Sequence, residues 1–287
     1  MRNKIRHINM QAKIWDITPK SVRRIFNLLR IAPRYISWLM NPMGRNHLKE
    51  VLSPYQDKYE KSRCVVIGNG PSLNNMDLSP LKNEFTFGLN RIYLLFEEWG
   101  FETSFLVSIN RFVLNQFSDD LRDLKMLKFF NWAYRDPYPV DENTVFLTPK
   151  MHYVANGNIY NGYYPIGGTV TNVALEIAYF MGFTEVILIG VDHAYREKGL
   201  GGKAVIAQEP DQDHFSPNYF DRGTVWQLPN YVVMEQGYIQ TKKLFEENGR
   251  KIVDATVGGK LHIFPKVTFE EYLISSNFKK KNNIELH

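Results

Sequence analysis

The chain has 287 residues, of which 44% are apolar and 23% charged, so it can bury a sizeable core and is not disordered as a whole. Its apolar runs fall short of the roughly 18 residues that span a bilayer. The start of the chain lacks the apolar core of a secretory signal, and the single cysteine, Cys64, excludes an internal disulfide framework. We therefore expect a cytoplasmic protein without a transmembrane helix.

The basic charge is concentrated at the N-terminal end. Residues 1–62 hold thirteen basic and four acidic side chains, a net charge of +9, whereas the rest of the chain carries −4. Residues 18–45 combine helical apolar spacing with arginines, Tyr35 and Trp38, which is typical of a helix lying on an anionic membrane surface. The alternative is a helix that packs on the main domain. We expect peripheral attachment to the inner face of the cytoplasmic membrane and no nucleic-acid partner; the oligomeric state stays open.

Short apolar runs alternate with helical patterns from Cys64 onward. The runs predict strands at 64–68, 85–89, 104–108, 126–130, 144–147, 185–190 and 251–254, and the helical patterns predict helices at 169–181 and 231–248. This alternation predicts an α/β fold, a Rossmann-like, mostly parallel sheet flanked by helices. We expect a helical extension over 1–62, a nucleotide-sugar-binding catalytic domain over 63–265 with a lid-like loop at about 196–230, and a C-terminal tail over 266–287.

A glycine-rich turn follows the first strand, where doubly wound sheets place their nucleotide loop. Gly68 and Gly70 would let a phosphate approach the backbone, while Asn69 and Ser72 offer polar groups to a ribose or phosphate. The sequence is neither GxGxxG nor a Walker loop. An ordinary strand-to-helix turn is the alternative.

Two further asparagines, Asn90 and Asn110, follow the second and third strands. Because the carboxyl ends of parallel strands line one crevice, we expect both to converge there with Asn69. Uncharged amides suit a nucleotide sugar, which needs donors and acceptors together. Each asparagine alone is also a common turn residue.

The long helix opens with Gly167, Gly168 and Thr169, and Asp192 follows the most apolar strand. Backbone N–H groups at a helix start attract anions. A plain N-cap by Thr169 or Thr171 is the alternative.

His214 lies in the polar loop, beside Asp211 and Asp213. No packing role is evident from the sequence, and a histidine can take up a proton near neutral pH. The Asp-Gln-Asp segment also matches a short metal-nucleotide motif, for which a solvated loop is the alternative.

Together, the GNGPSL turn, the strand-end asparagines, the Gly/Thr-led helix, the G-x-D after the apolar strand and the loop histidine resemble the bacterial CMP-sialic-acid-dependent sialyltransferases, glycosyltransferase family 42, and a wider group of related domains. The resemblance covers roughly Cys64 to Asp254. It implies a Rossmann-like domain with a lid, inverting sugar transfer, and neither metal nor cofactor. The donor would be a CMP-sugar carrying sialic acid or another ulosonic acid, and the acceptor a surface glycan or glycolipid, as in lipopolysaccharide or capsule biosynthesis.

The resemblance also implies individual roles. Asn69, Asn90 and Asn110 would hold the CMP-sugar, Gly168 and Thr169 the carboxylate of the donor sugar, and Asp192 would lie near the cytidine. His214 would be the general base, with Tyr195 and Tyr219 as candidates for contacting the leaving phosphate. The segment from Tyr195 to Asp213 departs from the family pattern.

The same wider group supports a second interpretation. It includes archaeal hydroxymethylpterin diphosphokinases, which transfer pyrophosphate from ATP with magnesium; here Asp192, Asp211 and Asp213 would bind the metal. A third interpretation is a non-catalytic nucleotide-binding protein.

Overall fold

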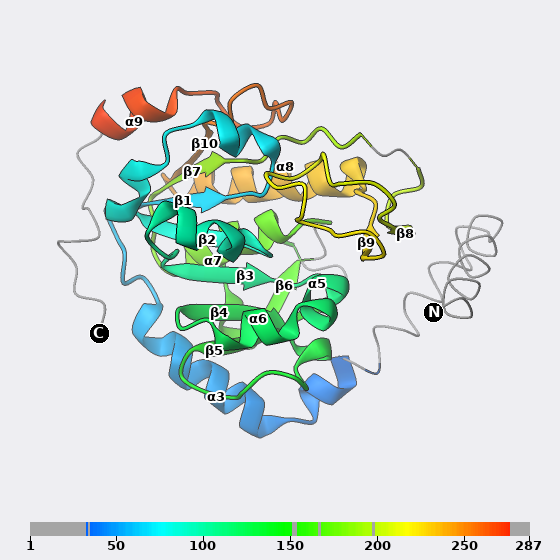
Figure 1. Cartoon of the computed structure of the whole chain (residues 1–287). Helices are drawn as coiled ribbons and strands as arrows, with labels where there is room; N and C mark the ends of the chain where they lie inside the picture. The colour runs from blue at the N-terminus through cyan, green and yellow to red at the C-terminus, as the bar shows by residue number, and fades with distance from the viewer. Residues whose placement is uncertain (1–32, 34, 151–153, 166–167, 197–198, 276–287) are drawn as a thin grey trace.

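The computed structural model describes residues 33, 35–150, 154–165, 168–196 and 199–275. Its centre is an eight-stranded sheet in the order β10-β7-β1-β2-β3-β4-β5-β6, with every pair of neighbours parallel (Figure 1). The strands are β1 (Arg63–Ile67), β2 (Phe85–Leu89), β3 (Phe105–Ser108), β4 (Leu127–Asn131), β5 (Thr144–Lys150), β6 (Tyr163–Pro165), β7 (Glu185–Ile189) and β10 (Lys251–Asp254). The predicted α/β fold with a mostly parallel sheet is confirmed.

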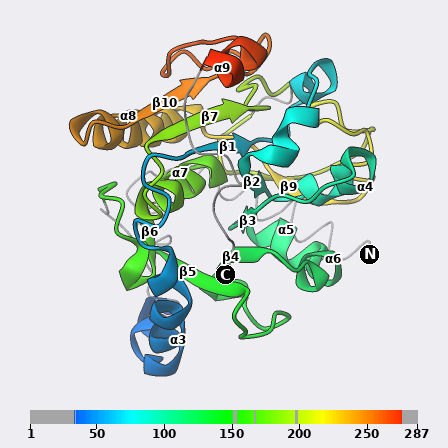
Figure 2. The ribbon, with the colours of Figure 1, turned by 90° about the vertical axis from the view of Figure 1, so that its left-hand side faces the viewer.

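Helices cover both faces of the sheet. Figure 2 shows α7 and α8 on one face and α4, α5 and α6 on the other. The α-helices are α3 (Pro42–Leu52), α4 (Phe96–Trp99), α5 (Arg111–Gln116), α6 (Ser118–Asp123), α7 (Val170–Phe180), α8 (Tyr231–Glu247) and α9 (Phe269–Ser275). Short 3-10 helices lie at Ser53–Tyr55, Pro71–Asn75, Ser79–Asn83, Ile92–Leu95, Trp132–Tyr134 and Ile159–Asn161.

The centre of the sheet explains the apolar runs of the sequence. β1 lies between β2 and β7, and all five residues of β1 and of β7 are buried. Strands buried on both faces have near-continuous apolar runs rather than alternation, and here only Arg63 and Glu185, at the strand starts, are charged. Helix α7 is likewise almost wholly buried, because it connects β6 to β7 across one face of the sheet.

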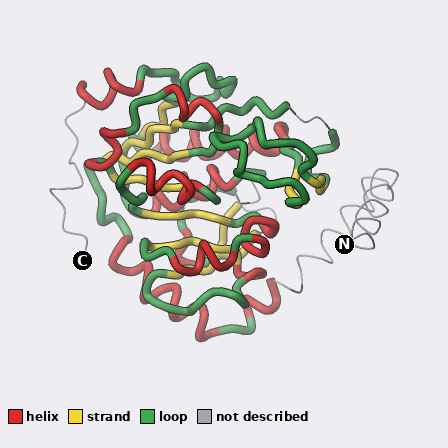
Figure 3. The backbone as a smooth tube through the Cα atoms, viewed as in Figure 1, coloured by secondary structure: helices red, strands yellow, loops and turns green. Residues whose placement is uncertain are grey.

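The connection between β7 and α8 is mostly loop, as predicted, but it also contains two short antiparallel strands (Figure 3). These are β8 (Ala204–Ile206) and β9 (Val225–Gln227). Their side chains are mostly half-buried or exposed, so no apolar run marks them in the sequence.

The segments before and after the predicted catalytic domain contact the sheet directly. Trp38 is fully buried, packs edge-on against Trp132 at 5.2 Å between ring centroids, and lies against Gly162. At the other end, Tyr272 on α9 donates its hydroxyl hydrogen to the Glu185 carboxylate at 2.9 Å. Most of the predicted basic helix, residues 18–32, lies outside the described residues.

Candidate active site

A pocket opens at the carboxyl ends of β1, β2 and β7, where the chain order of the sheet reverses. Ligands of doubly wound sheets bind at such switch points. The pocket holds about 570 Å³ of empty space, part of it open to solvent. Its lining combines backbone and side chains from the strand ends, the α7 start, the 192–195 and 213–214 segments and α8: Gly68, Asn69, Gly70, Leu89, Asn90, Thr169, Val170, Thr171, Gly190, Val191, Asp192, His193, Ala194, Tyr195, Asp213, His214, Met234 and Tyr238.

The two glycines of the turn after β1 are needed for contact with the turn after β7. A Cβ on Gly70 would lie 1.8 Å from Asp192 Oδ2, and one on Gly68 would lie 2.1 Å from the Gly190 carbonyl oxygen. Gly70 has φ −69° and ψ 154°, which any residue adopts, so it is space and not conformation that requires glycine there. Close packing against the turn after β7 therefore explains both glycines, without the phosphate contact expected from the sequence.

Asp192 joins the two turns. Its carboxylate accepts hydrogen bonds from the Ser72 backbone N at 3.1 Å and the Ser72 hydroxyl at 2.6 Å. Burial raises the pKa of Asp192, the hydrogen bonds from Ser72 oppose that rise, and the charge of Asp254 adds to it. Ser72 itself does not line the pocket among the described residues; it orients Asp192, which does.

Two of the three predicted asparagines meet in the pocket. Asn69 Oδ1 is buried and has no hydrogen-bond partner among the described residues. Asn90 has φ +50°, and its Oδ1 accepts a hydrogen bond from the Ser108 hydroxyl at 3.2 Å. Asn110 is instead the N-cap of α5, where its side chain accepts a hydrogen bond from Phe112 N at 2.8 Å, and it is not among the lining residues.

His214 is held firmly beside Asn69. Its Nδ1 lies 2.8 Å from Asp211 Oδ2, and Asp211 Oδ1 accepts hydrogen bonds from the backbone N of Asp213 and His214. The next residue, Phe215, donates its backbone N–H to the Asn69 carbonyl at 2.9 Å. With the Nδ1 proton donated to the carboxylate, Nε2 is the nitrogen left to accept a proton.

The expectation that His214 lacks a packing role is wrong. Its ring stacks on Tyr219, with 4.0 Å between centroids and 4° between planes, and it meets Phe220 edge-on. The histidine side chain is only 11% exposed. The local sequence therefore builds an aromatic support under the ring rather than a solvated loop.

The two candidate tyrosines differ in position. Tyr195 lines the pocket, and its ring centroid lies 6.3 Å from that of His214. Tyr219 is buried beneath His214 and does not line the pocket; its hydroxyl accepts a hydrogen bond from Arg91 N at 3.3 Å. Burial raises the pKa of both hydroxyls. Only Tyr195 is placed to contact a ligand directly.

The start of α7 forms another part of the lining. Thr169 is the N-cap, and its hydroxyl accepts a hydrogen bond from Thr171 N at 3.2 Å. Gly168 has φ +68° and packs against α8, outside the lining. Gly167 lies outside the described residues. The N-cap alternative and a role in the pocket are thus compatible for Thr169.

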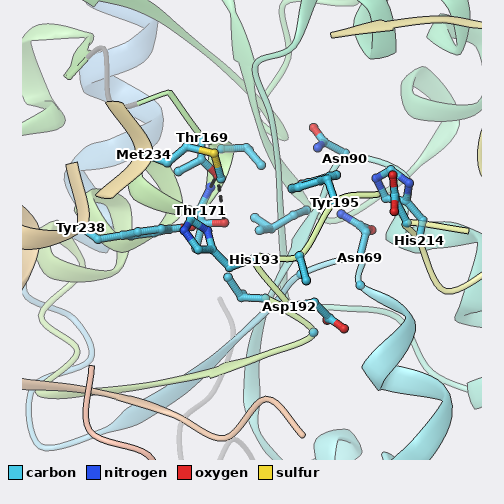
Figure 4. A pocket seen from close by; sticks show the side chains of 18 residues that line it. Asn69, Asn90, Thr169, Thr171, Asp192, His193, Tyr195, His214, Met234 and Tyr238 are labelled. Carbon is cyan, nitrogen blue, oxygen red and sulfur yellow. Dashed lines mark hydrogen bonds between the residues drawn. The ribbon is translucent and has the colours of Figure 1, made fainter. Parts of the chain in front are cut away.

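His193, Thr171, Met234 and Tyr238 also line the pocket, although no motif singles them out (Figure 4). His193 directly follows the Asp192 of the G-x-D motif, but the motif does not include it. Met234 and Tyr238 are four residues apart on one side of α8, a spacing that by itself indicates only a helix face.

The fold and pocket define a Rossmann-like α/β protein with its site at the switch point of the sheet. Residues 40–198 match the family described as 6-hydroxymethylpterin diphosphokinase MptE-like, and the chain belongs to this family. This confirms the predicted resemblance to the wider group.

Two other comparisons add little. The solved MAf glycosyltransferase from Magnetospirillum magneticum AMB-1 is similar at 14% identity, with a TM-score of 0.49, over 82% of this chain and 39% of that one. The chain thus spans well under half the length of that protein. No curated protein matches the chain.

Proposed function

We propose that this MptE-like protein is a group-transfer enzyme that moves sialic acid or another ulosonic acid from a CMP-activated donor to a glycan hydroxyl, with inversion. The observation that carries the proposal is the His214–Asp211 pair, fixed to the glycine-rich turn inside a pocket at the switch point. Its position suits a general base next to a bound nucleotide sugar.

The uncharged amides of the pocket fit the hydroxyl and amino groups of a nucleotide sugar. Asn69 Oδ1 is buried without a partner among the described residues, and a ligand hydroxyl or amino group would satisfy it. Asn90 lies at the neighbouring strand end, on the same side of the pocket. A ligand that binds these amides would extend along the pocket toward His214.

In the proposed reaction, the acceptor hydroxyl oxygen attacks the anomeric carbon of the donor while its proton passes to His214 Nε2. The bond from the anomeric carbon to the CMP phosphate oxygen breaks, and CMP leaves with both bonding electrons. Asp211 keeps the proton on Nδ1 and stabilises the imidazolium that forms, as a carboxylate behind a base histidine does. Tyr195, which lines the pocket, would donate a hydrogen bond to the departing phosphate.

A second candidate function follows from the family match: magnesium-dependent pyrophosphate transfer from ATP to a hydroxymethylpterin-like alcohol. It needs carboxylates that are available to a metal. Asp192 accepts from Ser72, Asp211 holds His214, and Asp213 accepts from Arg196 N at 2.9 Å. In the described part of the chain these carboxylates form no three-residue acidic or histidine cluster. This arrangement of donors favours the sugar-transfer proposal.

Calorimetry with the full chain separates the two functions. Titration with CMP, CTP and ATP, each with and without magnesium, should give magnesium-independent binding of CMP. Binding of ATP alone, and only with magnesium, would replace the sugar-transfer proposal with pyrophosphate transfer.

We also propose that the protein attaches to an anionic lipid surface on the cytoplasmic side of a membrane. Trp38, a predicted anchor, is buried in the domain, but Ile36, Leu39, Met40 and Met43 are exposed next to it, Met40 and Met43 by 77% and 81%. The net charge of +9 over residues 1–62 complements anionic head groups. Among the described residues, no helix has the length and apolarity to cross a membrane.

Sedimentation with vesicles containing phosphatidylserine tests this attachment. The double variant Leu39→Asp/Met43→Asp should stay in the supernatant, whereas the wild type and the control Leu94→Asp, whose exposed leucine lies elsewhere, should sediment with the vesicles. Equal sedimentation of both variants would contradict the proposal.

A further inference from the structure

The pocket has a second polar region, around His193, to which the proposed reaction assigns no residue. In Figure 4, His193 lies between Tyr238 and Asp192, close to Thr171, whereas His214 lies at the far right beyond Asn69. The residues with a role in the proposed reaction, His214, Asn69 and Asn90, lie together on the other side of the pocket. A histidine that lines a pocket away from the base calls for its own explanation.

One ring nitrogen of His193 is held by a partner and the other is not. Nε2 lies 3.0 Å from Glu235 Oε1 on α8, while Nδ1 is buried and has no partner among the described residues. The side chain is only 5% exposed. A buried polar atom without a hydrogen bond is unfavourable, so a ligand atom that bonds Nδ1 would be bound favourably.

The backbone of His193 also has an uncommon conformation. His193 has φ +53°, the left-handed region that a residue with a Cβ seldom adopts. Edge-on contacts with Tyr231 at 4.7 Å and Tyr238 at 6.3 Å between centroids fix the ring in that position. Strained positions of this kind cluster at ligand sites.

The groups around His193 are hydrogen-bond donors. The α7 start, with Thr169 and Thr171, lines the same pocket and carries the positive end of an 11-residue helix. The buried Tyr238 hydroxyl faces these two threonines but makes no hydrogen bond of ordinary geometry in the described chain. The nearby carboxylates are engaged elsewhere: Glu235 holds Nε2, and Asp192 accepts from Ser72.

We propose that His193 Nδ1, the Tyr238 hydroxyl and the start of α7 form a phosphate-binding subsite, separate from the His214 base. Glu235 holds the ring so that a protonated Nδ1 points at a phosphate oxygen. The inference rests on the proposed function for its nucleotide, because the phosphate of CMP would occupy the subsite. Phosphate binding at this end can nevertheless be measured without any nucleotide.

The test is calorimetry on the full chain with CMP, cytidine and inorganic pyrophosphate. The variant His193→Phe keeps an aromatic ring and should weaken CMP and pyrophosphate at least about tenfold, as expected for a lost charge-assisted hydrogen bond, and leave cytidine unchanged. His193→Asn, which keeps a donor near Nδ1, should bind better than His193→Phe. Glu235→Gln, at a half-exposed position, should weaken the same two ligands. His262→Ala, an exposed histidine elsewhere, is the control.

The outcomes separate the two proposals. Unchanged pyrophosphate and CMP affinity in His193→Phe, an equal loss of cytidine affinity, or no binding of any phosphate by the wild type overturns the subsite. Pyrophosphate binding that depends on His193, without any binding of CMP, supports the subsite and removes the proposed donor.

Discussion

Ser72 and Asp192 lie 120 positions apart in the chain and form two hydrogen bonds, one from the Ser72 backbone N and one from its hydroxyl. The contact fastens the turn after β1 to the turn after β7, and both turns line the pocket. The floor of the site is therefore a tertiary contact between two loops rather than a single nucleotide-binding loop.

Removal of the Ser72 hydroxyl tests this contact. Ser72→Ala should lower the free energy of unfolding by about 1–3 kcal/mol, because the Asp192 carboxylate loses a buried donor, and should raise the pKa of Asp192 further. Urea unfolding measures the first effect. Ser79→Ala, an exposed serine in the following turn, should stay near wild type; an equal loss in both variants would contradict the assignment.

Gly70→Ala should be strongly destabilising, by about 3 kcal/mol or more, because the new Cβ collides with Asp192 Oδ2. Gly100→Ala is the matched control: it has a positive φ but nothing within 4 Å, so it should cost only about 1 kcal/mol. Thermal unfolding compares the two. Adding Asp192→Ala to Gly70→Ala should restore part of the stability, and no recovery would show that Asp192 is not the source of the clash.

Removal of the proposed base gives the sharpest catalytic test. His214→Ala should lower kcat for CMP release from a CMP-ulosonate by about 10²–10⁴-fold, with CMP affinity within a few fold of wild type. Asp211→Asn should also lower kcat, because the amide no longer stabilises the imidazolium, and His262→Ala should not. Full activity of His214→Ala would reject the mechanism.

Glu176 makes stability depend on pH. This carboxyl is buried in α7, accepts a hydrogen bond from Gly157 N at 2.9 Å, and burial raises its pKa from 4.5 to about 7. The folded state therefore binds the proton more tightly than the unfolded state, so stability falls as pH rises from 4.5 to 7 and stays reduced above.

Glu176→Gln should remove this fall and be more stable than wild type by about 3 kcal/mol at pH 8, with little difference at pH 4.5 or below. Urea midpoints across this range measure it, with the exposed Glu247→Gln as control. The same pH dependence in Glu176→Gln and wild type would contradict the prediction.

Trp38 ties the N-terminal segment to the sheet. Trp38→Ala should cost about 3–5 kcal/mol, because the indole fills the space between Trp132 and Gly162. Ile36→Ala, two residues away and 51% exposed, should change stability little. If Trp38→Ala and the wild type unfold at the same midpoint denaturant concentration, the N-terminal segment does not stabilise the sheet.

The sequence predicts the central strands well because each is buried on both faces and reads as an uninterrupted apolar run. It misses β6, β8 and β9, because three residues each are too few to form a recognisable apolar run. It also locates Asn69, Asn90 and Asp192 at the crevice, since strand ends of a parallel sheet meet there.

What the sequence cannot supply are contacts made across long separations. The partner of Gly70 is Asp192, and the support of His214 is Tyr219, neither of which follows from a local pattern. The same holds for Trp38, because a basic segment with a tryptophan has the same sequence pattern whether the ring contacts lipid or packs on the domain.

The position of β1 between β2 and β7 has a consequence for synthesis. β2 follows β1 within twenty residues, but β7, its other neighbour, is made about 120 residues later. Until then one edge of β1, a strand that is apolar from Cys64 to Ile67, has no partner strand, a state prone to pairing with other chains. Folding that requires such a distant pairing is slow, so the growing chain is expected to be most prone to aggregation between synthesis of residue 67 and synthesis of residue 189.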